Sequence, residues 1–425
     1  MSTQTIGAGT AAETRLEGER LSGGKWLWLT VAASMFAAAW GGNEFTPLLV
    51  MYRLDHGYSP VMVDFFLFAY VVGIVPALLL GGPLSDRLGR RPIMLPAPII
   101  AIAGSTLLAF GADSAAALIL GRILCGIALG IGMAVGGSWV KELSTQPWDP
   151  TASEGAGARR AAMSLTAGFA LGAGAAGILA QWAPMPSVLA YVLHIAITVL
   201  AAMALWRAPE TRPAQAKSDR RRLIDDLKIP SAGHRRFLYV VVPLAPWVFG
   251  AASVAYAVIP ALMTGHSGDA PVAFSALLCM VALTCGFAIQ SLGRKIDTDR
   301  SARGAVVALV FLVVGMAGAA LVASTLTVAI AIVAAAILGC GYGMALVSGL
   351  LEIQRIAGPD DLAGLTAVFY SITYIGFAVP ALLAMLSESI PALSYTVTLL
   401  FGSAAAAACL ILILFKSRSH LPSAT

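Results

Sequence analysis

Two charged residues, Glu44 and Arg122, lie within long apolar stretches of this 425-residue sequence. The first stretch contains WGGNEFTPLL and the second contains LGRILCGIALGIG. A charge in an apolar environment is costly unless it is paired. Counted inward from the polar residues Asp55 and Asp113, the two charges differ in depth by only about 3 Å at the rise of an α-helix. We therefore predict that Glu44 and Arg122 form an ion pair, either directly or through water.

The same position makes Glu44 the best candidate for a proton carrier. Burial favours the neutral carboxyl group and a nearby arginine favours the carboxylate, so a change in water access could switch its protonation. The alternative is a permanent structural salt bridge with Arg122. His194 lies in another apolar stretch and could join this proton-coupling cluster, although a single buried histidine is more often a core residue.

The composition predicts an all-α integral membrane protein. Hydrophobic residues form 58% of the chain and charged residues 12%, whereas soluble domains contain about 25% charged residues. A helix needs about 20 mostly apolar residues to cross a bilayer. Twelve such stretches predict twelve membrane-spanning helices, at 26–51, 61–82, 92–111, 115–140, 161–182, 187–206, 237–263, 271–292, 304–324, 327–351, 363–386 and 394–415.

The distribution of Lys and Arg predicts how these helices are oriented. All but two of the 27 Lys and Arg residues, the exceptions being Arg53 and Arg122, lie on the side that carries both termini. Positively charged connections mark the cytoplasmic side of a membrane, so both termini are expected in the cytoplasm. The net charge of +5 comes without a basic patch interleaved with aromatic residues, which argues against nucleic-acid binding.

One long polar segment divides the predicted helices into two sets of six. Its mixed charges and few large apolar residues favour a solvated tether over an interfacial helix. The expected organisation is a polar cytoplasmic tail over 1–24, an N-terminal six-helix bundle over 25–206, a central cytoplasmic loop over 207–236, a C-terminal six-helix bundle over 237–415 and a cytoplasmic tail over 416–425.

A short charged motif, GPLSDRLGRR, joins the second and third predicted helices, and a weaker copy, GFAIQSLGRK, occurs in the second half. The motif resembles the signature loop of the major facilitator superfamily of membrane transporters. The matching positions are Gly82, Asp86, Arg87, Gly89, Arg90 and Arg91. The resemblance implies two pseudo-symmetric six-helix bundles in a bacterial cytoplasmic membrane, in a protein that can work as a monomer.

The motif also implies a gating role. We expect Gly82 to allow close helix approach and Gly89 to adopt a positive φ. In the superfamily this loop latches the two halves on the cytoplasmic face when the transporter is open outward. The resemblance implies this role for Asp86, Arg87 and Arg90, with Glu142 as a possible ion partner. The second copy has Gln290 in place of the acid, which weakens a symmetric latch.

Two further helices resemble superfamily motifs. Arg122, with Gly126 and Gly130, resembles the fourth-helix motif. The fifth predicted helix, GFALGAGAAG, resembles the antiporter motif but has Ala173 in place of its proline and Ala176 in place of a glycine. The signal for antiport is therefore weak, and small-residue helix packing is the alternative.

A substrate chamber is expected between the two halves, near the middle of the membrane. Polar and aromatic side chains of the apolar stretches are its candidate lining, with packing or an interfacial belt as the alternative for each aromatic residue. The candidates are Asn43, Glu44, Tyr70 and Arg122 in the first half and Trp247, Tyr256, Tyr342, Tyr370, Ser371 and Tyr374 in the second.

These features favour a proton-coupled exporter of small, fairly apolar organic or drug-like molecules that works by alternating access. The alternative is proton-coupled uptake of a polar metabolite such as a sugar or an organic acid, in which Arg122 could bind a carboxylate. An enzyme is not expected, because the sequence contains neither GxxxxGK[ST] nor HExxH. No metal, nucleotide or prosthetic group is implied.

Overall fold

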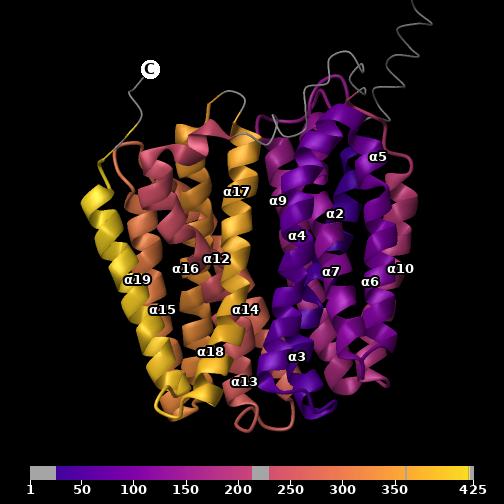
Figure 1. Ribbon diagram of the computed structural model, residues 1–425. Helices are drawn as coiled ribbons and strands as arrows, with labels where there is room; N and C mark the ends of the chain where they lie inside the picture. Colours follow the sequence, from indigo (N-terminus) through magenta and orange to yellow (C-terminus); the bar gives the residue numbers. More distant parts are fainter. Residues whose placement is uncertain (1–24, 213–228, 359–360, 420, 422–425) are drawn as a thin grey trace, which may run out of the picture.

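The computed structural model describes residues 25–212, 229–358, 361–419 and 421 of the chain. The predicted tail over 1–24, most of the central loop and the last C-terminal residues lie outside the described residues. Figure 1 shows two bundles of long, roughly parallel helices standing side by side, the first built from α2 to α10 and the second from α12 to α19. The prediction of an all-α membrane fold is confirmed.

The first bundle alternates long helices with short connections. Its elements are α2 (Trp28–Asn43), α3 (Phe45–Leu54), α4 (Pro60–Leu88), α5 (Arg90–Met94), α6 (Pro96–Phe110), α7 (Ala115–Ile131), the π-helical turn η1 (Gly132–Gly136), α8 (Gly137–Leu143), α9 (Ala156–Trp182) and α10 (Pro186–Leu205).

The second bundle has the same up-and-down arrangement. Its elements are η3 (Pro230–Gly233), η4 (Phe237–Val241), α12 (Val242–Ser253), η5 (Val254–Val258), α13 (Ile259–Met263), α14 (Pro271–Ile296), α15 (Arg303–Thr325), α16 (Val328–Ile356), α17 (Leu362–Ile375), η6 (Gly376–Ala378), α18 (Val379–Ser389) and α19 (Tyr395–Lys416).

Among the described residues, 11 helices are long and apolar enough to cross a membrane. The first predicted span, 26–51, is instead divided into α2 and α3 at Glu44. Proline has no N–H group, so Pro47 cannot donate a hydrogen bond to the carbonyl of Asn43, four residues earlier. Glu44 keeps helical backbone angles, with φ −59° and ψ −29°. The two helices therefore continue one another, with an interruption at the buried acid.

Within the first bundle, glycines bring α4 and α7 into backbone contact. A Cβ atom on Gly73 would lie 2.9 Å from the backbone nitrogen of Ile127, and one on Gly126 would lie 3.0 Å from that of Ile74. Small residues allow such close approach between membrane helices. Gly82 behaves differently, because a Cβ atom there would meet no heavy atom within 4 Å. The prediction that Gly82 allows close helix approach is therefore wrong.

The two bundles meet along two seams. Helix α4 packs against α17 and α18, and α14 packs against α9 and α3. The C terminus and α5 lie at one end of the molecule, which we call the terminal face, whereas α3 and α13 lie at the other end, the opposite face (Figure 1). The break at Glu44 lies between α2 and α3, away from both faces of the molecule.

The contact between α4 and α7 yields a stability prediction. Gly126→Ala forces a methyl group into the backbone of α4, and overpacking of this kind costs about 1–3 kcal/mol. We expect a lower midpoint of thermal unfolding for purified protein in detergent.

Gly137→Ala is the matched control, because a Cβ atom at this helical position meets nothing within 4 Å. It should be neutral or stabilising by up to about 1 kcal/mol, because alanine favours helix more than glycine does. Equal unfolding midpoints for the two variants would contradict the close contact at Gly126.

Candidate functional site

Glu44 is fully buried at the junction of α2 and α3. Its Oε1 atom lies 3.2 Å from the hydroxyl of Ser105 on α6 and 3.3 Å from Nδ1 of His194 on α10. Its Oε2 atom has no hydrogen-bond partner among the described residues. The expected direct ion pair with Arg122 is not present within the described chain; His194, the third predicted member, occupies that place. We call Glu44, Ser105 and His194 the acid–imidazole cluster.

The hydrogen bonds of His194 define where its protons can lie. Its Nε2 atom is 3.0 Å from the carbonyl oxygen of Ala37 and 3.0 Å from the hydroxyl of Thr198. A carbonyl oxygen can only accept a hydrogen bond, so Nε2 carries a hydrogen. The Nδ1 atom lies 2.7 Å from the Ser105 hydroxyl. In a neutral imidazole this nitrogen is an acceptor, and Ser105 then donates to it.

Ser105 has a single hydroxyl hydrogen, which limits the cluster. When it donates to His194, it cannot also donate to Glu44. When Glu44 is ionised and His194 is neutral, two hydrogen-bond acceptors, Oε1 of Glu44 and Nδ1 of His194, therefore lie 3.3 Å apart. The Ser105 hydroxyl has one hydrogen to donate, so one of the two acceptors is left without it. One additional proton removes this conflict, either as a carboxylic acid that donates to Ser105 or as an imidazolium that donates to the carboxylate. The geometry is thus suited to hold one exchangeable proton.

Arg122 is buried within α7, as predicted, but it contacts backbone and aromatic rings. Its guanidinium group donates to the carbonyl oxygens of Gly42 at 3.2 Å and Phe66 at 3.4 Å. It also lies 4.7 Å from the ring centroid of Phe45 and 4.4 Å from that of Tyr70. Cation–π contacts of this kind are favourable for a desolvated arginine. The charge interacts electrostatically with Glu44 without touching it.

Aromatic rings from both bundles meet next to Arg122. Tyr70 on α4 contacts Tyr374 and Phe377, with ring centroids 6.2 and 6.3 Å apart. Phe249 on α12 stacks on Tyr374 at 4.5 Å and on Phe377 at 5.0 Å, and Tyr256 lies 6.3 Å from Phe377. The hydroxyl of Tyr70 is buried without a hydrogen-bond partner among the described residues. The five rings pack against one another where the substrate chamber was predicted, and we call them the aromatic chamber.

The other predicted chamber residues are distributed around it. Asn43 lies on the seam, where its amide donates to the carbonyl of Phe169 at 3.0 Å and to the sulfur of Cys279 at 3.4 Å. The Ser371 hydroxyl donates to its own helix, at Ala367. The remaining three, Trp247, Tyr342 and Tyr370, pack against the hydrophobic core.

Several polar and aromatic residues of this region were not predicted. Ser105 and Thr198 lie in apolar helices and bond to His194, and Phe249 and Phe377 complete the chamber. The polarity of Ser105 and Thr198 inside predicted spans was an available signal, whereas phenylalanine in a membrane helix carries none.

A second buried acid, Asp64 near the start of α4, interacts electrostatically with Arg53 and Glu388.

The charged loop of the first half forms a dense network at the terminal face. Arg90 is 4% exposed and pairs with Glu142 at 2.6 Å and with Asp86 at 2.8 Å. Gly89 has a φ of 101°, as predicted. The carboxylate of Glu210 accepts hydrogen bonds from the backbone N–H groups of Arg90 and Arg91, both at 2.9 Å. Glu210 therefore caps the short helix α5.

This network also extends to the end of the first bundle. Asp86 pairs with Arg212 at 3.2 Å, and the Thr211 hydroxyl donates to Glu142 at 2.5 Å. Glu210, Thr211 and Arg212 belong to the PETR stretch, whose role in this network was not predicted. These contacts of Asp86, Arg90 and Glu142 join residues of the first half, so the expected latching across the halves is not what they do in this conformation.

The second half has its own network, although Gln290 replaces the acid in the motif copy. Arg236, just before η4, pairs with the buried Glu352 through hydrogen bonds of 2.5 and 2.7 Å. Arg355 bonds to Glu352 at 2.9 Å, to Asp299 at 3.0 Å and to Asp297. Burial raises the pKa of Asp297 above its ordinary value, although Arg355 opposes the shift.

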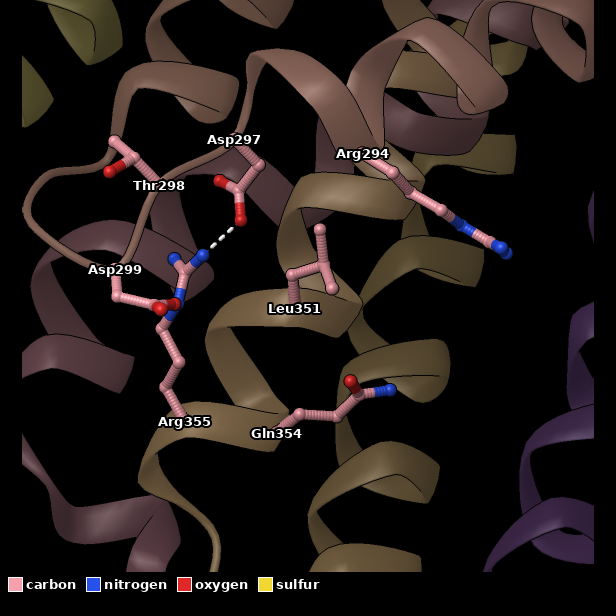
Figure 2. A pocket seen from close by; sticks show the side chains of 7 residues that line it. All are labelled: Arg294, Asp297, Thr298, Asp299, Leu351, Gln354 and Arg355. Atoms are coloured by element: carbon pink, nitrogen blue, oxygen red, sulfur yellow. Dashed lines mark hydrogen bonds and ion pairs between the residues drawn. The ribbon is translucent and has the colours of Figure 1, made fainter. Parts of the chain in front are cut away.

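Figure 2 shows the part of this second network that lines a surface pocket, at Asp297, Asp299 and Arg355. Asp297 and Asp299 approach Arg355 from the loop after α14, whereas Arg294 of the motif copy points away from them. Asp297, seven positions after Gln290, pairs with Arg355 of α16 and not with Arg294 of the motif copy. The expectation that Gln290 weakens a symmetric latch concerns contacts across the two halves, which these ion pairs within the second half do not test, so it stays a prediction.

The comparison with known protein families agrees with this architecture. The sequence model of the Major Facilitator Superfamily matches residues 27–381. The chain belongs to this superfamily. Membership of this superfamily identifies it as a membrane transport protein and not an enzyme.

Individual proteins that are similar to this chain show how far the likeness extends. A chloramphenicol resistance protein of Pseudomonas aeruginosa is 28% identical over 261 residues, which cover 61% of this chain and 59% of that protein. A POT family transporter crystallised with 5-aminolevulinic acid has a TM-score of 0.75 at 14% identity, over 93% of this chain and 96% of its own. The nucleoside transporter NupG has a TM-score of 0.68 at 10% identity, over 92% and 99%. The two structures share the superfamily fold with this chain.

The hydroxyl of Ser105 yields a prediction on pH dependence. In Ser105→Ala the carboxylate and the imidazole lose their shared hydrogen-bond partner, and such a bond contributes about 1 kcal/mol. The protonated cluster is the form that loses more, because Ser105 there accepts from the Glu44 carboxylic acid and donates to His194, whereas in the deprotonated cluster it makes only one of these bonds. The midpoint of the pH–transport profile should therefore move downward by up to about one pH unit.

Thr106→Ala is the matched control on the same helix, because the Thr106 hydroxyl bonds to Ile102 and is exposed. The profile of this variant should coincide with that of the unmodified protein. A Ser105→Ala profile that also coincides would show that the hydroxyl takes no part in proton binding.

The first-half network yields a separate prediction. Asp86 is partly exposed, with 42% of its side chain accessible, so Asp86→Asn should change the free energy of unfolding by less than about 1 kcal/mol. A gating role predicts impaired transport in liposomes together with normal folding and insertion. Asp113→Asn, at an acid that is 92% exposed and pairs with His56, should transport normally. Full activity of Asp86→Asn would remove the gating role.

Proposed function

We propose that this transporter exports small, uncharged, largely aromatic molecules in exchange for protons by alternating access. The observation that supports the proposal most directly is the juxtaposition of the acid–imidazole cluster with the aromatic chamber. One element connects them, because Gly42, Asn43 and Glu44 are consecutive residues at the break between α2 and α3.

The acid–imidazole cluster is the proposed proton site. Burial and the shortage of hydrogens between Glu44, Ser105 and His194 favour uptake of one proton, whereas the positive charge of Arg122 favours its release. Because these effects oppose one another, a modest change in hydration can switch the protonation state. Rocking of the two bundles would supply that change by exposing the cluster to one face at a time.

Arg122 is the proposed connection between the proton and the substrate. It bonds to the carbonyl of Gly42 and lies over the ring of Tyr70. When Glu44 is ionised, attraction to the carboxylate draws the guanidinium group towards α2. When Glu44 is protonated, this attraction is lost and contact with the chamber is favoured. Proton binding would thus alter the chamber that receives the substrate and shift the balance between the two states.

The chamber supports an uncharged aromatic substrate. Its five rings contact one another in this conformation and would separate to admit a ligand. The buried hydroxyl of Tyr70, which has no hydrogen-bond partner among the described residues, offers one donor for an acceptor on the ligand. The chloramphenicol resistance protein among the relatives makes chloramphenicol, an uncharged aromatic compound, the first substrate to examine.

Uptake of a sugar or an organic acid is the alternative function. An organic acid would need a free cation in the chamber, and Arg122 could bind one only by giving up its contacts with Gly42, Phe66 and the two rings. Chloramphenicol accumulation in cells that express the protein is compared with accumulation in cells that do not. Lower accumulation in the expressing cells is expected for export, and higher accumulation would contradict it.

The proposed exporter is a monomer in the bacterial cytoplasmic membrane, with its terminal face and both termini in the cytoplasm. The positions of the Lys and Arg residues support this orientation. Small-molecule substrate, protons and the lipid bilayer are its proposed partners.

The proton carrier is tested by Glu44→Gln, which keeps the size of the side chain and removes its titration. Purified protein is reconstituted in liposomes, and chloramphenicol transport driven by a pH gradient is measured. We expect loss of gradient-driven transport with retained substrate exchange. Glu154→Gln, at an exposed surface acid, is the control and should keep coupling. Unchanged gradient-driven transport in Glu44→Gln would remove Glu44 as the carrier.

A further inference from the structure

A single glutamine of the first bundle caps a helix of the second. Gln181 is the penultimate residue of α9, and its Oε1 atom accepts hydrogen bonds from the backbone N–H groups of Val272 at 3.0 Å and Ala273 at 3.2 Å. Its amide Nε2 donates to the carbonyl of Asp269 at 3.2 Å. Three hydrogen bonds from one side chain thus cross the seam between the bundles at the opposite face.

The first turn of α14 relies on Gln181 for its hydrogen-bond acceptor, because the residues at the start of α14 provide no side-chain cap. Its N-cap residue, Ala270, has no side-chain hydrogen bond, and the next residue is Pro271. The N–H groups of Val272 and Ala273 belong to the first turn, whose donors have no partner within the helix. A cap normally comes from Ser, Thr, Asn or Asp at the N-cap position itself. Here the acceptor is supplied by the other bundle.

Small residues below Gln181 bring the two helices close enough for this contact. A Cβ atom on Gly177 would clash with the Cβ atom of Ala276, and one on Gly174 would lie 2.7 Å from the sulfur of Met280. Gly174, Gly177 and Gln181 are spaced by three and four residues and so share one face of α9. This face is fitted to α14 over nearly two turns.

The ion pairs described at the terminal face lie within single bundles, in contrast to Gln181. We infer that Gln181 is the latch that holds the opposite face closed, and that this conformation opens towards the terminal face. To open the opposite face, α14 must leave α9, and water then replaces the glutamine as the partner of the two N–H groups. The inference rests on the proposed alternating access and adds to it a named residue for one of the two closed states.

The latch carries no charge, which separates it from the proton site. Its hydrogen bonds join an amide to backbone groups, so its strength should not depend on whether the acid–imidazole cluster holds its proton. Loss of a helix cap changes an equilibrium by about fivefold or more. Because the cap exists only while the opposite face is closed, this change should appear in the balance between the two states.

The experiment is hydrogen exchange, read by mass spectrometry, on the full chain in lipid nanodiscs. In Gln181→Ala, amides at the start of α14 should exchange about fivefold faster than in the unmodified protein. Amides at the terminal-face ends of α9 and α14 should exchange more slowly, because that face closes as the opposite face opens. Gln354→Ala, at an exposed glutamine of α16, is the control and should change neither region.

Gln181→Glu keeps the acceptor for both N–H groups and loses only the bond to Asp269, so its exchange should lie near that of the unmodified protein. Faster exchange at α14 of Gln181→Ala without slower exchange at the terminal face would describe a helix cap that does not gate, and would overturn the inference. Unchanged exchange at both faces would overturn it as well. Gradient-driven transport by the unmodified protein would still stand in either case, so the proposed function is tested separately.

Discussion

The buried carboxyl group of Glu44 is the constraint on which the rest of the account depends. A carboxylate in a membrane interior is tolerated only with compensation, and this one has an imidazole and a hydroxyl on one side and a nearby guanidinium group that it does not touch. The deprotonated state has too few hydrogens for its acceptors, and the protonated state gives up the electrostatic attraction of Arg122. A site in this condition responds to small changes in hydration, which is the property that a transporter must have if it is to exchange a proton between two faces.

The surrounding helices hold Arg122 in place and join the proton site to the aromatic chamber. Backbone contact between α4 and α7 at Gly73 and Gly126 holds Arg122 against Tyr70, and the break at Glu44 lets one short segment serve both the proton site and the chamber. The charge networks at the terminal face hold each bundle as a unit. Movement is thereby confined to the seams, where hydrogen bonds are few and Gln181 provides three of them.

The sequence was sufficient for the fold class, the burial of Glu44 and Arg122 and the turn at Gly89, because apolar length and motif spacing are local properties. It was insufficient for the partner of Glu44. Depth along two helices does not specify which way their side chains face, so Arg122 was expected where His194 and Ser105 lie. The latch could not be predicted for the same reason. A glutamine at a helix end carries no sequence signal of its own, and its role depends on the two N–H groups of the other bundle that lie against it.

The central claim is that one proton on the acid–imidazole cluster is exchanged for substrate. Proton release is the most direct measurement: chloramphenicol is added to purified protein in weakly buffered detergent solution, and the pH change is followed with an indicator dye. The account predicts about one proton released per protein molecule that binds substrate, and no release from Glu44→Gln at equal occupancy. Substrate binding without proton release, or equal release from both proteins, would contradict it.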